Sequence, residues 1–70
     1  MLKEKILWMV KNGFKQMFTS RETFAYSYKG YIWTENDIQK YSLDAIKKCK
    51  TYYDDKITKN ELENYLKETK

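Results

Sequence analysis

An aromatic segment that alternates around one Lys-Gly pair limits the fold of this chain more than any other feature. Residues 23–34, TFAYSYKGYIWT, carry a large aromatic side chain at every second position on either side of Lys29 and Gly30. Alternation and aromatic enrichment are typical of β-strands, and Gly30 accepts the positive φ that a tight turn requires. The segment therefore predicts a β-hairpin that turns at Lys29-Gly30.

The register of this hairpin decides which side chains share a face. A two-residue turn pairs Tyr28 with Tyr31 and leaves the aromatic side chains together: Phe24, Tyr26, Tyr28, Tyr31 and Trp33. The other face then carries Ala25, Ser27 and Ile32. A three-residue loop with a bulge would shift the pairing by one and divide the aromatic residues between the faces. We expect the two-residue register, with helices covering the aromatic face because an isolated hairpin is marginal in water.

The first eighteen residues carry the pattern of an amphipathic helix. Apolar residues recur every three or four positions: Leu2, Ile6, Met9, Val10, Gly13, Phe14 and Met17. We expect one helix over residues 2–18, with Gly13 inside the apolar face, where the missing side chain allows close packing. Trp8 departs from this face and is expected to project among lysines.

A second helix is expected to begin directly after the hairpin. Thr34 followed by Asp37 is a capping signal, and Trp33 is placed to pack against Ile38 across the helix start. The apolar stripe of this helix is expected to run without a break: Ile38, Tyr41, Ala45, Ile46, Cys49, Tyr52 and Tyr53.

A third helix is shorter. Thr58 followed by Glu61 is a further capping signal, and the helix after it is expected to bury three residues: Leu62, Tyr65 and Leu66. The order along the chain is then α-β-β-α-α. We expect an α+β fold in which residues 1–70 form one small domain, and helices cover a two-stranded antiparallel hairpin.

No residue pattern marks a catalytic site. The sequence contains no His, the side chain that most often transfers protons near neutral pH. Asp54 and Asp55 are adjacent carboxylates, but neighbours in a turn point apart and stay solvated, so their pKa values should be near normal. We expect no enzymatic activity and no cofactor.

One stretch resembles half of a calcium-binding motif. Residues 54–61 follow the second half of an EF-hand loop. The same alignment puts Lys50 at the first ligand position, where a positive charge opposes calcium, and Asp55 where the motif needs Gly. Thr58 and Glu61 are explained by helix capping, so we expect no metal site.

Cysteine usage and hydropathy indicate a compartment. Cys49 is the only cysteine, which excludes an internal disulfide and favours a reducing, cytoplasmic setting. Its place on an apolar stripe predicts a small buried hydrophobe rather than a reactive thiol. The longest apolar run, Ile6–Val10, is far shorter than the roughly 20 residues of a membrane span, and no secretory signal is recognisable. The Met1 start favours a complete cytosolic product.

The charge of the chain is uneven. The net charge is +4, and residues 1–34 carry six basic and two acidic side chains, whereas residues 35–70 carry eight of each sign. This asymmetry predicts an acidic partner for the N-terminal half. An aromatic anchor with a basic rim is typical of interface hot spots. The candidate partner-binding residues are Trp8, Lys5, Lys11, Lys15, Arg21 and Lys29; alternatively, Trp8 could lie flat over Gly13 or a neighbouring loop.

These features favour a non-enzymatic protein-binding module with an acidic protein partner and no membrane role. Self-association of two copies through Trp8 is an alternative use of the same surface. The Lys-, Asn-, Ile- and Tyr-rich composition suits AT-rich codons. With the small size, it suggests a stoichiometric inhibitor or adaptor of a phage or mobile element, acting on a host defence or nucleic-acid enzyme.

The alternative function is a small basic nucleic-acid-binding protein. Its lysine-rich first helix would contact phosphates, and the aromatic hairpin would stack on bases. That function needs aromatic side chains in solvent. A domain of 70 residues needs the same side chains in its core, because so short a chain has little other apolar surface to bury.

Overall fold

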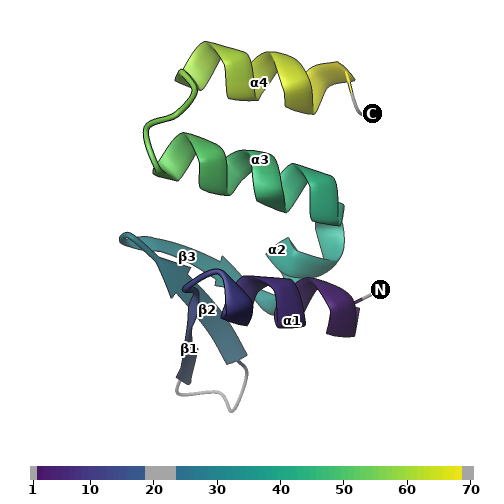
Figure 1. The fold of residues 1–70 in the computed structure, drawn as a ribbon. Coiled ribbons are helices and arrows are strands. Elements are labelled where there is room, and N and C mark those ends of the chain that lie inside the picture. Colours follow the sequence, from purple (N-terminus) through teal and green to yellow (C-terminus); the bar gives the residue numbers. More distant parts are fainter. Residues whose placement is uncertain (1, 19–23, 69–70) are drawn as a thin grey trace.

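The fold is α+β, with an antiparallel sheet and helices packed above it (Figure 1). The computed structural model describes residues 2–18 and 24–68. The elements are α1 (Leu2–Lys11), β1 (Lys15–Phe18), β2 (Phe24–Tyr28), β3 (Tyr31–Thr34), α2 (Glu35–Lys40), α3 (Leu43–Tyr53) and α4 (Lys59–Glu68). In Figure 1, α3 lies between α4 above it and the layer formed by the sheet and α1 below it.

Gly13 ends the first helix. Its φ is +95°, in the left-handed region that favours glycine. The Gly13 N–H donates to the carbonyl of Val10 at 3.3 Å, and the Phe14 N–H donates to the carbonyl of Met9 at 2.9 Å. This pair of hydrogen bonds is a Schellman motif, and the side chains of Met9 and Phe14 both join the core. The motif ends the helix, and the chain leads away from it into β1 (Figure 1).

The prediction of one helix over residues 2–18 is therefore wrong in its second half. Lys15–Phe18 is a strand that pairs antiparallel with β2, with Lys15 opposite Ser27. The described sheet has three strands in the order β1-β2-β3, so the expected two-stranded hairpin is wrong as well. Apolar residues after the glycine fit either a helix or a strand, and the sequence analysis followed the helical period too far.

The hairpin between β2 and β3 has the predicted register. Tyr28 lies opposite Tyr31. Lys29 and Gly30 have φ angles of 49° and 86°, as a two-residue turn of the mirror-image type requires. The right-handed twist of the strands favours this turn type, which Gly30 adopts without strain.

The first capping prediction is confirmed, but the helix it begins is short. The Asp37 N–H donates to the Thr34 hydroxyl at 3.3 Å, and the Thr34 N–H donates to the Asp37 carboxylate at 3.1 Å. α2 ends at Lys40 because Tyr41 and Ser42 are extended, and the Ser42 hydroxyl accepts from the Ala45 N–H to begin α3. The unbroken helix and the order α-β-β-α-α are therefore wrong: the described order is α-β-β-β-α-α-α.

The last helix begins where the sequence predicts. The Glu61 N–H donates to the Thr58 hydroxyl at 3.2 Å. Leu62 is buried, while Tyr65 and Leu66 are half-buried, and α4 packs on α3.

The aromatic face of the sheet forms the core with helical residues. Tyr26 and Trp33 are each 5% exposed, and the Trp33 indole N–H donates to the hydroxyl of Tyr53 on α3 at 3.1 Å. The core comprises Met9, Phe14, Tyr26, Trp33, Ile38, Ile46, Cys49 and Leu62. Tyr31 is 42% exposed, yet its ring stacks on the Tyr53 ring at 3.8 Å between centroids. The apolar stripe predicted over residues 2–18 is only partly buried, since Val10 and Met17 are exposed.

Candidate functional site

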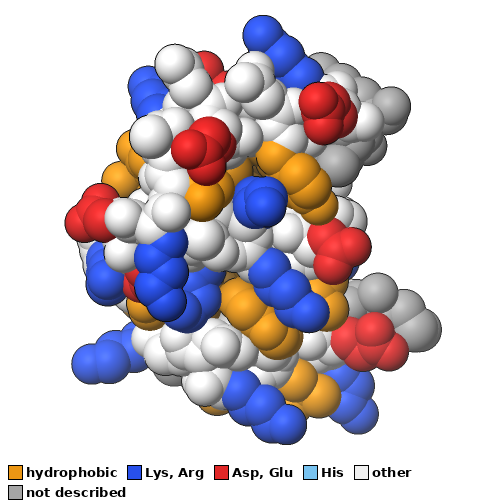
Figure 2. Space-filling view, turned by 45° about the horizontal axis from the view of Figure 1, so that its top comes forward, with side chains coloured by type: hydrophobic (Ala, Val, Ile, Leu, Met, Phe, Trp, Pro, Cys, Tyr) orange, Lys and Arg blue, Asp and Glu red, His pale blue; other side chains and the backbone are white. Residues whose placement is uncertain are grey.

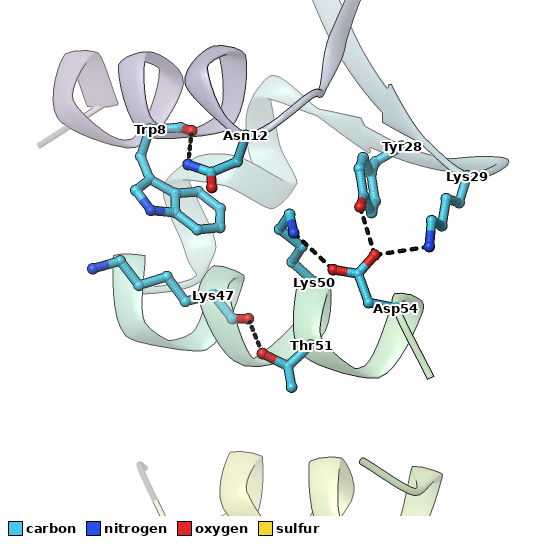
Figure 3. Close-up of polar contacts among 8 residues, drawn as sticks. All are labelled: Trp8, Asn12, Tyr28, Lys29, Lys47, Lys50, Thr51 and Asp54. Atoms are coloured by element: carbon cyan, nitrogen blue, oxygen red, sulfur yellow. Dashed lines mark hydrogen bonds and ion pairs between the residues drawn. The ribbon is translucent and has the colours of Figure 1, made fainter. Parts of the chain in front are cut away.

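Trp8 lies at the edge of the core and faces α3. It is half-buried, and its ring centroid is 6.2 Å from that of Phe14. The ammonium of Lys47 on α3 lies 5.9 Å from the centre of the indole (Figure 3). The side chain of Asn12 donates to the Trp8 carbonyl at 2.7 Å and satisfies one of the last carbonyls of α1. Trp8 is thus fixed on one side by Phe14 and covered in part by a lysine from another helix.

The lysines expected around Trp8 are distributed differently. The Lys5 ammonium donates to the carbonyls of Ile38 and Gln39 at 3.1 and 3.4 Å, so its charge lies against the C-terminal end of α2. Lys15 belongs to β1 because α1 ends before it, and it is exposed. Lys11 is exposed and follows Trp8 by about one helical turn.

Arg21 lies outside the described residues, and Lys29 sits at the hairpin turn. The predicted ring of Lys5, Lys11 and Lys15 depended on a helix that continued to residue 18. The helix ends before Lys15, so β1 rather than the helix of Trp8 carries this lysine.

The carboxylate of Asp54, the residue that follows α3, connects the β2–β3 hairpin to this helix. One oxygen of Asp54 accepts from the Tyr28 hydroxyl at 2.5 Å and lies 2.8 Å from the Lys29 ammonium. The other oxygen lies 2.7 Å from the ammonium of Lys50, one turn earlier on α3 (Figure 3). Asp54 therefore clamps the tip of the hairpin to the end of the helix.

These contacts change the titration of the cluster. Hydrogen bonds from Lys29, Lys50 and Tyr28 hold the pKa of Asp54 well below its usual range. The pKa values of Lys29 and Lys50 are raised, in each case first by the bond to Asp54. The expected solvated turn with near-normal pKa values is therefore wrong for Asp54, because the hairpin tip folds over it.

We define the basic face as Trp8, Tyr28, Lys29, Lys47, Lys50 and Asp54, which come from α1, the β2–β3 hairpin, α3 and the residue that follows it. Lys29 and Lys50 both pair with the Asp54 carboxylate, and these are the two ion pairs among the described residues. The Lys47 ammonium lies over the Trp8 ring instead. Figure 2 shows lysine side chains from the top to the bottom of one side of the molecule, with acidic side chains near the top and the edges. The basic face as defined holds three lysines and one carboxylate, which leaves a net charge of +2.

Sequence analysis missed Lys47, Lys50 and Asp54 as members of this face. The signal was present in their spacing, since three and four residues place side chains on one side of a helix. Only the apolar stripe of that segment was considered, and the approach of Trp8 and of the hairpin tip is a tertiary feature.

Cys49 is buried in the core, as expected. Burial raises the pKa of its thiol to about 11. At neutral pH the side chain is a thiol that packs as a small hydrophobe.

Comparisons with protein-family models, curated proteins and solved structures found no match. No helix within residues 2–18 and 24–68 is long and apolar enough to cross a membrane. In the same part of the chain, no three His, Cys, Asp or Glu side chains are grouped to hold a metal ion. The functional argument therefore depends on the geometry of the surfaces described above.

Proposed function

We propose that this chain is a non-enzymatic binding module that holds an acidic surface of a partner protein against its basic face. The observation that carries the proposal is the gathering of three lysines and a single carboxylate on one surface. Lys29 and Lys50 pair with Asp54, and the Lys47 ammonium lies over the half-buried Trp8. Asp54 is paired on both oxygens, so it offers little repulsion to an incoming carboxylate. Lys47 makes neither ion pair, and its ammonium is available to a partner.

The composition of the face suits a protein interface. Interfaces use aromatic anchors surrounded by charged rims, and rim charges accelerate the encounter of complementary surfaces. Trp8 supplies the aromatic part and is held in place by Phe14. Lys29 supplies a charge that is ordered before binding by its pair with Asp54, which lowers the entropy lost when a partner binds.

The buried aromatic face weighs against nucleic-acid stacking as the main function. Tyr26 and Trp33 are each 5% exposed, so they cannot lie against a base without unfolding. Tyr31 is more open, but one side of its ring is already stacked on Tyr53. Phosphate contacts by lysines remain the nucleic-acid alternative that the experiment below separates.

The extension to a biological role is by analogy. A small basic domain that binds one partner stoichiometrically resembles the inhibitors and adaptors that phages and mobile elements direct against host defence or nucleic-acid enzymes. The unpaired Cys49 fits a reducing cytoplasmic setting for that encounter.

The test is affinity capture with the full chain as bait, with and without nuclease. The variant carries Lys47→Glu in the basic face and Lys11→Glu on α1, about one helical turn after Trp8. The matched control carries Lys59→Glu and Lys67→Glu on α4, where both lysines are exposed. The two variants change the net charge equally, so they differ only in the place of the change.

The proposal predicts that a partner protein is captured whether or not nuclease is added. The Lys11/Lys47 variant should no longer capture this protein, whereas the control should still capture it. A parallel titration with single-stranded and duplex oligonucleotides should show no binding. Capture that disappears with nuclease, or salt-dependent binding of oligonucleotides in the micromolar range, would assign the face to nucleic acid instead.

A further inference from the structure

A second surface lies along the free side of β3, apart from the basic face. It is an open hollow of about 230 Å³ between β3, α2, α3 and α4. Four aromatic side chains line it: Tyr31, Trp33, Tyr41 and Tyr53. Pockets for drug-sized ligands enclose roughly 300–1,000 Å³. The hollow is therefore the size of a small headgroup rather than of a whole drug-like molecule.

The aromatic rings form walls with different orientations. The rings of Tyr31 and Tyr53 are nearly parallel, with 13° between their planes. The ring of Tyr41 meets that of Trp33 at 70°, with 5.6 Å between centroids. The Trp33 indole N–H is already bonded to the Tyr53 hydroxyl, which fixes two of the walls against each other. A group that enters the hollow meets ring surfaces from more than one direction.

The charge of the hollow is negative. Asp37 is the one charged side chain among the described lining residues, and no lysine or arginine lines the hollow. Its carboxylate accepts hydrogen bonds from Thr34 but makes no ion pair among the described residues, since both pairs there belong to Asp54. A carboxylate beside several ring faces attracts a cation through its own charge and through the ring quadrupoles.

The ring of Tyr41 already attracts one cation. The ammonium of Lys40 lies 5.6 Å from the ring centre, although Lys40 is exposed and does not line the hollow. The interior of the hollow is more favourable for a weakly hydrated cation. An ammonium that carries methyl groups is more weakly hydrated than the lysine ammonium, so it loses less hydration when it moves from water onto the rings.

We propose that this hollow binds a trimethylammonium group, either of a choline-type small molecule or of a trimethylated lysine. The open sides of the Tyr31, Tyr41 and Tyr53 rings contact the methyl groups, the almost fully buried Trp33 contributes little accessible surface, and Asp37 provides the countercharge. The hollow shares no lining residue with the basic face, although the Tyr53 ring lies 6.4 Å from the Tyr28 ring. The proposal does not rest on the partner proposed for the basic face.

The test uses the two indole N–H signals in a proton–nitrogen NMR spectrum of the full chain. Choline chloride is titrated against sodium chloride at equal ionic strength. The neutral isostere 3,3-dimethylbutan-1-ol, with carbon in place of the ammonium nitrogen, is titrated separately. The Trp33 signal should shift and saturate, while the Trp8 signal should stay in place. Choline should bind at least about tenfold more tightly than the neutral isostere.

A variant of the carboxylate separates charge recognition from folding. Asp37→Asn keeps an oxygen that can cap Thr34, and it should weaken choline binding several-fold without changing the affinity for the neutral isostere. Asp44→Asn is the matched control, because Asp44 is exposed in the first turn of α3 and does not line the hollow. It should leave both affinities unchanged.

Two probes identify the source of the headgroup. Choline and N-acetyl-trimethyllysine amide carry the same cation on different stems, and saturable binding of either one above the neutral isostere supports the site. Equal binding of choline and its isostere, no saturable shift with either cation, or equal shifts of both indole signals would overturn the proposal.

Discussion

The aromatic face of the sheet and the outer face of α1 are both apolar in sequence, yet the first is buried and the second is exposed to solvent. Tyr26 and Trp33 are each 5% exposed, whereas Leu7 and Val10 are each 53% exposed. Burial of the first pair follows from the helices packed over the sheet. No described element covers the second pair to the same extent.

The difference shows what a hydrophobic pattern can establish. A periodic apolar stripe says which residues would face a common surface, but burial also requires an opposing element. Met9, on the inner side of α1, is fully buried, although Val10 is its direct neighbour in sequence. One helix therefore supplies both a core residue and an exposed apolar residue.

Truncation of a core side chain should give the largest difference between the two regions. Ile46→Ala removes a fully buried side chain and should lower the free energy of unfolding by about 2–5 kcal/mol, enough to unfold part of the population of so small a domain. Val10→Ala on the outer face should cost less than about 0.5 kcal/mol. Urea denaturation of both variants checks this, and similar losses would contradict the assigned burial.

The stability of the fold should be next most sensitive to changes in the turn that ends α1. Gly13→Ala puts a side chain at a φ of +95° and brings its Cβ 3.4 Å from a ring carbon of Tyr28. That distance is at the close limit of ordinary van der Waals contact, so we expect a loss of about 1–2 kcal/mol from backbone strain alone. Gly30→Ala meets no atom within 4 Å and tests strain alone. The two losses should be similar in urea denaturation, and no loss at either position would contradict the assigned φ angles.

The clamp between hairpin and α3 predicts a dependence of stability on pH. The pKa of Asp54 is lowered in the folded state. Its contribution should thus be present above its unfolded pKa of about 3.9 and be lost as the pH falls through the lower folded value. Melting temperatures between about pH 5 and pH 2 should fall more steeply for the native chain than for Asp54→Asn.

Asp55→Asn is the control for the clamp. Asp55 is exposed and has a φ of 60°, which Asn tolerates. This variant should follow the native pH profile, and a profile as flat as that of Asp54→Asn would show that the clamp is not the cause.

Removal of the cation over Trp8 should have the smallest effect on folding. Lys47→Gln loses a cation–π contact at an accessible site, so the expected cost is about 0.5–1 kcal/mol or less. The amount of partner protein captured should fall strongly, although the free energy of unfolding changes little. An unfolded Lys47→Gln variant in circular dichroism would show that the residue is structural.

Local signals in the sequence predicted the hairpin and two helix starts. Lys29-Gly30 between alternating aromatic residues defines a register that the structure confirms. Thr34 and Thr58 both cap helices, because their hydroxyls satisfy N–H groups three residues later. Each of these features is encoded within a few neighbouring residues.

The features that were missed depend on competition between local signals or on tertiary contacts. Asn12-Gly13 was a stop signal for α1, but the apolar residues after it also fitted a helical period. Ser42 capped α3 within a segment whose apolar stripe suggested no break. The basic face could not be predicted as a unit, because Trp8 and Lys47 come together only when α1 and α3 pack.

Hydrogen exchange at the two indole nitrogens tests most directly whether Trp33, on the aromatic face of the sheet, belongs to the core. The Trp33 N–H is bonded to Tyr53 and almost inaccessible, whereas Trp8 is half-buried at the edge. We predict that Trp33 exchanges only through global unfolding, at least about 100-fold more slowly than Trp8. Equal exchange at the two positions would mean that the aromatic face opens freely to solvent, and the account would fail.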